Sequence, residues 1–146
     1  METIEENAVS LFKGGLNCSQ SVLTAYSEEF GFDKGLASAI SCGFGGGMGR
    51  LQETCGAVTG AFMALGIYNC KKYTGNKDRK EKTYSMVKEF NKKFKTIHAT
   101  TNCRLLLGAD LNFPEGQKYV NEHNLHEIIC EKCIKDAVQI VNELTN

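Results

Sequence analysis

The chain has 146 residues, 42% of them hydrophobic and 23% charged, and its 17 basic and 17 acidic side chains give a formal net charge of zero. A neutral chain lacks the basic excess on which general nucleic-acid binding depends, so we expect no nucleic-acid partner. The acidic opening METIEENAVSLF has no signal-peptide core and no apolar run is long enough for a membrane span, so we expect a cytoplasmic protein.

Helical periodicity and turn residues predict three helices in the first part of the chain. The first covers Ile4–Lys13 and ends at two glycines. The second covers Cys18–Phe30, because Asn17 is a good N-cap residue and Gln20 completes a capping box. The third covers about Asp33–Cys42. No repeat or long linker divides the chain, so we expect a single domain over residues 1–146.

The stretch GFGGGMGR, residues 43–50, predicts an irregular loop, because so many glycines do not form a stable helix or strand. It lacks the lysine of a phosphate-binding P-loop and follows no strand. A glycine-rich backbone can instead approach a bound group closely and donate N–H hydrogen bonds to it. The candidate cofactor-binding glycines are Gly45, Gly46, Gly47 and Gly56.

The stretch ETCGAVTGAFMALGIYNCKKY, residues 53–73, predicts a long apolar helix that Thr54 caps. Gly56, Gly60 and Ala64 are spaced four residues apart and form a ridge of small side chains on this helix. Such a ridge allows another helix to approach closely. The partner is either a helix of the same chain or a second copy in a homodimer.

The remaining sequence predicts further helices and no strand. A polar amphipathic helix covers about Arg79–Ile97, and a short helix covers Cys103–Leu107. The stretch GADLNFPEGQ is expected to be a loop, and Asn124 with Glu127 predicts the start of a last helix that continues to about Leu144. The expected fold is all-α, a bundle of five or six helices with the glycine-rich loop between its third and fourth helices.

The cysteines are the residues that say most about function. In a reducing compartment, a set of cysteines is more typical of metal binding or redox chemistry than of structural disulfides. Three of the seven, Cys18, Cys55 and Cys103, directly follow a residue of N-cap type. Each is thus expected in a first helical turn, where free N–H groups and the helix dipole stabilise a thiolate and lower its pKa. A buried cysteine is also a common small core residue, and that interpretation stays open for each of them.

The pair CEKC, Cys130 and Cys133, has the spacing of a redox pair or of half a zinc site, but here it lies within the last predicted helix. Cys133 falls on the apolar stripe of that helix and Cys130 at its edge. Cys42 and Cys70 have no cap and no spaced partner, so we expect them to be packing residues.

The stretch FGGGMGRLQETCGAVTGAFMALG, residues 44–66, together with CRLLLG at 103–108, resembles the family of redox-active proteins named for a C…GCAxxG…C…C pattern. NCSQSV near the start and EKCIKDAVQIVNEL at the end also match this family. Its four marker cysteines fall on Cys18, Cys55, Cys103 and Cys133. Three of these are the helix-start cysteines, and the fourth is the inward cysteine of CEKC.

The resemblance implies a redox role and a bound prosthetic group, an iron–sulfur cluster held by these four cysteines. A protein with such a cluster would transfer electrons to a redox partner protein or act as an accessory oxidoreductase. Three alternatives remain: zinc on the same four thiolates, a metal-free thiol–disulfide protein or sensor in which Cys18 or Cys103 pairs with Cys55, and a helical adaptor whose cysteines are mostly core.

Overall fold

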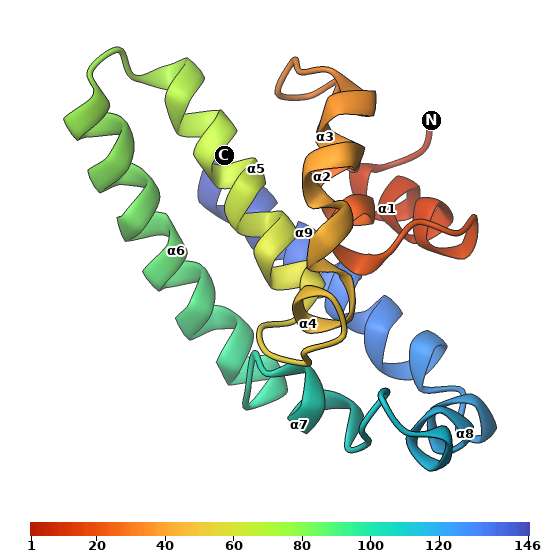
Figure 1. Ribbon diagram of the computed structural model, residues 1–146. Helices are drawn as coiled ribbons and strands as arrows, with labels where there is room; N and C mark the ends of the chain where they lie inside the picture. The colour runs from red at the N-terminus through yellow and green to blue at the C-terminus, as the bar shows by residue number, and fades with distance from the viewer.

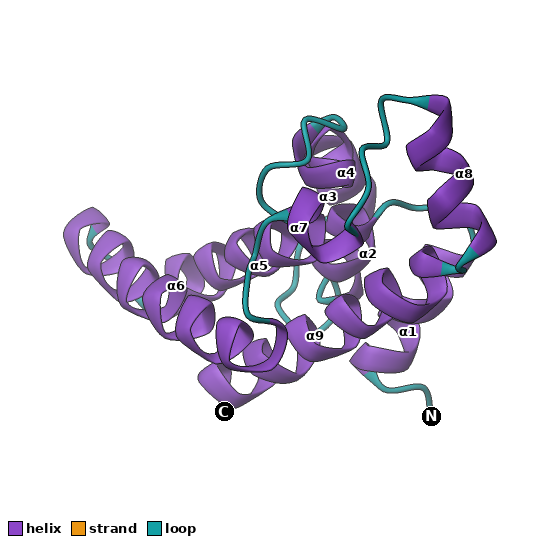
Figure 2. Cartoon of the chain, turned by 90° about the horizontal axis from the view of Figure 1, so that it is seen from below, coloured by secondary structure: helices purple, strands orange, loops and turns teal.

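Helices make up most of the chain in the computed structural model, which describes all 146 residues and contains no strand (Figure 1; Figure 2). The predicted all-α class is therefore confirmed. The helical segments, with the labels of Figure 1, are α1 (Ile4–Lys13), α2 (Cys18–Ala25), α3 (Lys34–Ser41), α4 (Gly45–Met48), α5 (Gly56–Lys72), α6 (Asn76–His98), α7 (Cys103–Leu107), α8 (Pro114–Glu122) and α9 (Glu131–Thr145).

The predicted number of helices is wrong: there are eight, not five or six. The segment α4 is not counted, because Gly46 and Gly47 within it have positive φ and do not continue a right-handed helix. The helix that the sequence analysis missed is α8, which begins inside the expected loop GADLNFPEGQ. Pro114 occupies its first turn, where the missing N–H of proline costs nothing and its fixed φ favours the helix.

Side-chain caps fix several of the predicted helix starts. Asn17 accepts a hydrogen bond from the N–H of Gln20, and the side chain of Gln20 accepts one from the N–H of Asn17, so the predicted capping box is confirmed. Asn102 likewise accepts from the N–H of Leu105 at the start of α7. α2 ends earlier than predicted, because Tyr26 breaks the helical pattern and the chain continues in turns.

The last helix begins differently from the prediction. Asn124 has a φ of +53° and makes no side-chain cap. A π-helical turn, His126–Cys130, follows it and leads into α9, with the N–H of Glu131 donating to the carbonyl of His126. π turns are rare and occur frequently at functional sites.

The helix α5 lies at the centre of the fold and packs against α2, α6 and α9 (Figure 1). Large side chains with no exposed surface, including Leu65, Phe90 and Ile134, fill the space between these helices. α1 packs against α2 and α9, and the hydroxyl of Tyr26 lies 2.9 Å from the carbonyl oxygen of Val138 in α9. No helix combines the length and the apolar character needed to cross a bilayer.

The ridge of small residues on α5 is used inside the molecule. A side-chain carbon built on Gly60 would lie 2.7 Å from the carbonyl oxygen of Ser19, and Ala64 is fully buried. α5 and α2 therefore approach each other more closely than larger residues at these positions would allow.

Candidate functional site

The glycine-rich loop forms a left-handed turn beside the start of α5. Five consecutive residues, Gly46 to Arg50, have φ between +62° and +68°. Three of them are glycines, but Met48 and Arg50 carry side chains, and for such residues this conformation costs about 1–2 kcal/mol each. The surrounding structure must therefore hold this turn in place.

After this turn, the backbone pairs with the segment that precedes α7. The N–H of Cys55 donates to the carbonyl of Thr101 at 2.7 Å, and the N–H of Cys103 donates to the carbonyl of Glu53 at 2.6 Å. Between them, Thr54 and Asn102 form an isolated antiparallel bridge. Cys55 and Cys103 thus lie on adjacent backbone segments although they are 48 residues apart in the chain.

The starts of α2 and α5 also meet closely. A side-chain carbon on Gly56 would lie 3.0 Å from the backbone nitrogen of Ser19 and 3.1 Å from the Cβ of Cys18. A side chain at position 56 would therefore be crowded, because the segments that carry Cys18 and Cys55 approach each other closely at this point. Gly47 has the same role for α7, since a Cβ there would lie 2.6 Å from the Cβ of Cys103.

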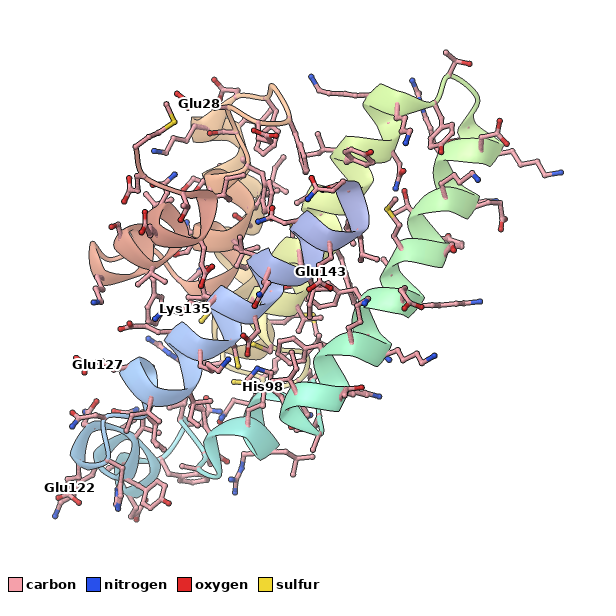
Figure 3. All side chains as sticks on the ribbon, turned by 180° about the vertical axis from the view of Figure 1, so that it is seen from behind. Glu28, His98, Glu122, Glu127, Lys135 and Glu143 are labelled. Carbon is pink, nitrogen blue, oxygen red and sulfur yellow. The ribbon has the colours of Figure 1, made fainter.

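These segments enclose a cavity of about 400 Å³. Six of the seven cysteines line it: Cys18, Cys42, Cys55, Cys103, Cys130 and Cys133. The candidate cofactor-binding glycines Gly45, Gly46, Gly47 and Gly56 also line it, together with Arg50 and His126. In Figure 3, several yellow sulfur atoms appear together in the middle of the view, and others lie apart nearer its edges.

Two of the thiols, Cys55 and Cys133, form a buried pair, named here the inner pair. Cys55 is 7% exposed and Cys133 is 1% exposed. The thiol of Cys133 hydrogen-bonds to the sulfur of Cys55, which lowers the pKa of Cys55, and the backbone N–H groups of Ala57 and Val58 in the first turn of α5 lower it further. The same hydrogen bond and burial raise the pKa of Cys133.

Cys18 and Cys130 form a second pair, the outer pair, and both are only half-buried. The thiol of Cys18 hydrogen-bonds to the sulfur of Cys130. This contact, with His126, lowers the pKa of Cys130 to about 6. The contact with Cys130 and burial raise the pKa of Cys18. The Nδ1 atom of His126 lies 3.7 Å from the sulfur of Cys130, and this contact raises the pKa of His126.

Cys103 has no thiol partner and lies beside Gln52 instead. The buried amide of Gln52 donates to the carbonyl of Ala109 at 2.9 Å and accepts from the N–H of Leu111 at 2.7 Å, and its nitrogen is 4.0 Å from the sulfur of Cys103. Burial, together with the charge of Cys55, raises the pKa of Cys103 to about 12.

The expectation that a helix start lowers the pKa of a cysteine is wrong for Cys18 and Cys103. For Cys55 the pKa is lowered as expected, but the hydrogen bond with Cys133 is the largest cause and the N–H groups of the helix start add to it. For Cys18, the hydrogen bond to Cys130 and burial outweigh the helix dipole. For Cys103, burial dominates, and α7 has only five residues with which to build a dipole. In addition, Cys55 is itself the N-cap residue of α5, so Thr54 is not the predicted cap.

The structure brings all four predicted cysteines, Cys18, Cys55, Cys103 and Cys133, to one cavity. It also places there residues that the sequence analysis left aside. Cys42 lines the cavity although it was expected to be a packing residue, and Cys130, expected at the edge of the apolar stripe of the last helix, also lines the cavity and lies beside Cys18. Cys70 is exposed on α5 and does not line the cavity. The spacing of His126 and Cys130, one turn apart, was the signal that could have revealed their contact.

The side chains that line the cavity carry donor atoms of the kind that soft metals prefer. The lining contains six thiols, the imidazole of His126 and no carboxylate. Thiolates favour zinc, copper(I) and iron–sulfur clusters over magnesium or calcium. As the side chains stand, no three of them converge on one point as an ion would need. A single zinc ion needs four donors within about 2.3 Å of one centre.

The fold and the cavity together define an all-helical protein with a site of clustered cysteines. A family model described as "Putative redox-active protein (C_GCAxxG_C_C)" matches residues 16–144, and the chain belongs to this family. The resemblance seen in its motifs is thereby confirmed. No curated protein and no solved structure matches the chain significantly.

Proposed function

We propose that this redox-active protein transfers electrons by means of an iron–sulfur cluster held by Cys18, Cys55, Cys103 and Cys133. The observation that carries the proposal is that these four cysteines, from four separate helical segments, line one cavity that has no carboxylate. A bound cluster would supply one-electron chemistry at a potential that its ligands, hydrogen bonds and exposure set.

The residues around the four cysteines suit this role. The N–H groups of Ala57 and Val58 favour the thiolate of Cys55, which is the form that binds metal. Gly47 and Gly56 leave no side chain between the backbone and Cys103 or Cys18, so those segments can hold their sulfurs close to a bound group. Arg50 and His126 provide positive or polar groups at a site where several thiolates would repel one another.

Anaerobic reconstitution with ferrous iron and sulfide tests the proposal. The wild-type chain should turn brown and contain iron and acid-labile sulfide in a fixed ratio per chain. Cys55→Ser should lose both, because it removes a ligand, whereas Cys70→Ser should keep both, because Cys70 lies outside the cavity. A colourless, iron-free wild type would refute the proposal, and stoichiometric zinc without iron would select the zinc alternative.

A metal-free thiol–disulfide protein is the second candidate, and the inner pair favours it. Cys55 and Cys133 are already hydrogen-bonded, and the pKa of Cys55 is lowered, as an attacking thiol requires. This pairing differs from the expected partners of Cys55, which were Cys18 and Cys103. Thiol titration of the unfolded chain before and after reductant tests it: an increase of two thiols traced to this pair supports the candidate, and an unchanged count removes it.

A further inference from the structure

The outer pair differs from the inner pair in what can reach it. Cys18 and Cys130 are both half-buried and His126 is exposed, whereas Cys55, Cys103 and Cys133 are nearly inaccessible. A small molecule that enters the cavity from solvent therefore reaches the outer pair, like the exposed Cys42, more readily than the inner pair. Cys130 does not belong to the four cysteines assigned to the cluster, so its place beside Cys18 needs a reason of its own.

Three groups meet at the outer pair. Cys18 and Cys130 are neighbours on the wall of the cavity although the two residues come from opposite ends of the sequence. The Nδ1 atom of His126 lies 3.7 Å from the sulfur of Cys130. The π turn, His126–Cys130, holds this histidine and this cysteine on the same side of the helix, where both line the cavity.

We propose that Cys18 and Cys130 form a peroxide-reactive dithiol, in which a small hydroperoxide oxidises the two thiols to a disulfide with the help of His126. The chemistry needs an accessible thiol, a proton acceptor beside it and a second thiol within reach, and the outer pair supplies all three.

The reaction balances in two steps. The sulfur of Cys130 attacks the terminal oxygen of the hydroperoxide, the O–O bond breaks, and Cys130 becomes a sulfenic acid. The proton of the Cys130 thiol passes through Nδ1 of His126 to the alcohol, or water, that leaves. The sulfur of Cys18 then attacks the sulfur of Cys130, the S–O bond breaks, and water leaves with the proton of Cys18. Two thiols lose two electrons, and the peroxide gains them.

The disulfide has a consequence for the site that rests on the proposed function. Cys18 is one of the four cysteines assigned to the cluster, and a sulfur within a disulfide no longer binds metal as a thiolate. Peroxide would thereby remove one ligand and close the site to loading, and a reductant of disulfides would reopen it.

Hydrogen peroxide is the probe that tests the proposal. The reduced full-length chain is treated with one equivalent under anaerobic conditions, the remaining thiols are blocked, and non-reduced proteolytic peptides are analysed by mass spectrometry. We expect a disulfide between Cys18 and Cys130. A disulfide of the inner pair, a link from Cys18 to Cys42, or no disulfide at all would overturn the proposal.

Variants of the two nearby histidines test the part of His126. His126→Gln should slow disulfide formation by about a hundredfold, at the lower end of the effects of general base catalysis. His123→Gln is the matched control, because Nδ1 of His123 faces the carbonyl of Tyr119 in its own helix, and it should leave the rate unchanged. Equal rates in both variants would contradict the role of His126.

Iron loading separates this proposal from the proposed function. A wild-type chain that forms the disulfide between Cys18 and Cys130 but never binds iron would refute the cluster and leave the dithiol intact. A chain that binds iron but forms no such disulfide after removal of the metal would refute the dithiol alone.

Discussion

The helical body of the molecule and the segments that enclose its cavity are built in different ways. The body consists of α1, α2, α5, α6 and α9, whose residues keep right-handed helical geometry. The cavity segments are residues 42–55 and 99–130, and they contain every non-glycine residue with positive φ: Met48, Arg50, Gln52, Ala99 and Asn124. Such backbone costs energy and persists only where neighbouring structure enforces it. Regular packing thus fixes the body, and strained backbone is confined to the cavity segments.

The largest expected effect comes from filling the space at Gly47 in the cavity segments. Gly47→Ala would place a Cβ 2.6 Å from the Cβ of Cys103 and 2.7 Å from the Cα of Gln52, at a φ of +67°. We expect a loss of about 4 kcal/mol in the free energy of unfolding, from strain and overpacking together. Urea denaturation measures it, and Gly43→Ala is the control, because nothing lies within 4 Å of that position. Similar losses in the two variants would contradict a close approach at Gly47.

Removing the buried amide of Gln52 should have the next largest effect. Gln52→Leu leaves the carbonyl of Ala109 and the N–H of Leu111 without partners. An unsatisfied buried group costs roughly 1–3 kcal/mol, so we expect a loss of about 3 kcal/mol in the free energy of unfolding. Gln117→Leu removes a single hydrogen bond, to the carbonyl of Leu111 from an exposed side chain, and should cost less than about 1 kcal/mol. Equal costs would mean that Gln52 does not join the cavity segments.

Within the helical body, two glycines of α5 should respond in opposite directions. Gly60→Ala would bring a Cβ within 2.7 Å of the carbonyl oxygen of Ser19 and should cost about 2 kcal/mol of unfolding free energy. Gly66→Ala has nothing within 4 Å and should gain up to about 1 kcal/mol, because alanine favours a helix. Thermal unfolding of both variants measures the difference, and a stabilising Gly60→Ala would refute the tight contact between α2 and α5.

The smallest expected effect comes from replacing an alanine by glycine. This change should stabilise the protein at residue 99 in the cavity segments and destabilise it inside a regular helix. Ala99 ends α6 with a φ of +68°, so Ala99→Gly relieves strain and should stabilise the protein by about 1 kcal/mol. Ala39→Gly, at an exposed position inside α3, should destabilise it by about 1 kcal/mol. Chemical denaturation of both variants provides the comparison. The same sign in both would show that φ at residue 99 imposes no strain.

The sequence predicted well what depends on neighbouring residues along the chain. The all-α class follows from helical periodicity, and the caps Asn17 and Asn102 are local hydrogen-bond patterns that any such helix start would use. For the same reason, the sequence placed Cys18 and Cys103 at the first positions of their helices. The family pattern then selected the four cysteines that share the cavity.

What the sequence did not predict depends on contacts between distant segments. The N-cap of α5 is Cys55 and not the predicted Thr54, because Thr54 pairs with Asn102, a partner that no local pattern specifies. The pKa values of Cys18 and Cys103 rise because burial and a neighbouring thiol or charge outweigh the helix dipole. Cys130 and His126 entered the site through a π turn: their spacing of four residues indicates a contact between the two, but a period of 3.6 does not place either of them at the cavity.

The pairing of the Cys55 segment with the Cys103 segment has a consequence for how the protein is made. Successive members of the four cysteines are 30 to 48 residues apart in the chain, and the last of them, Cys133, comes after α8. While the ribosome is still producing the first half of the chain, no pocket of sulfurs exists, since its walls have not been synthesised. Any group that these sulfurs hold is inserted after α9 has emerged, into a chain that has already brought its distant parts together.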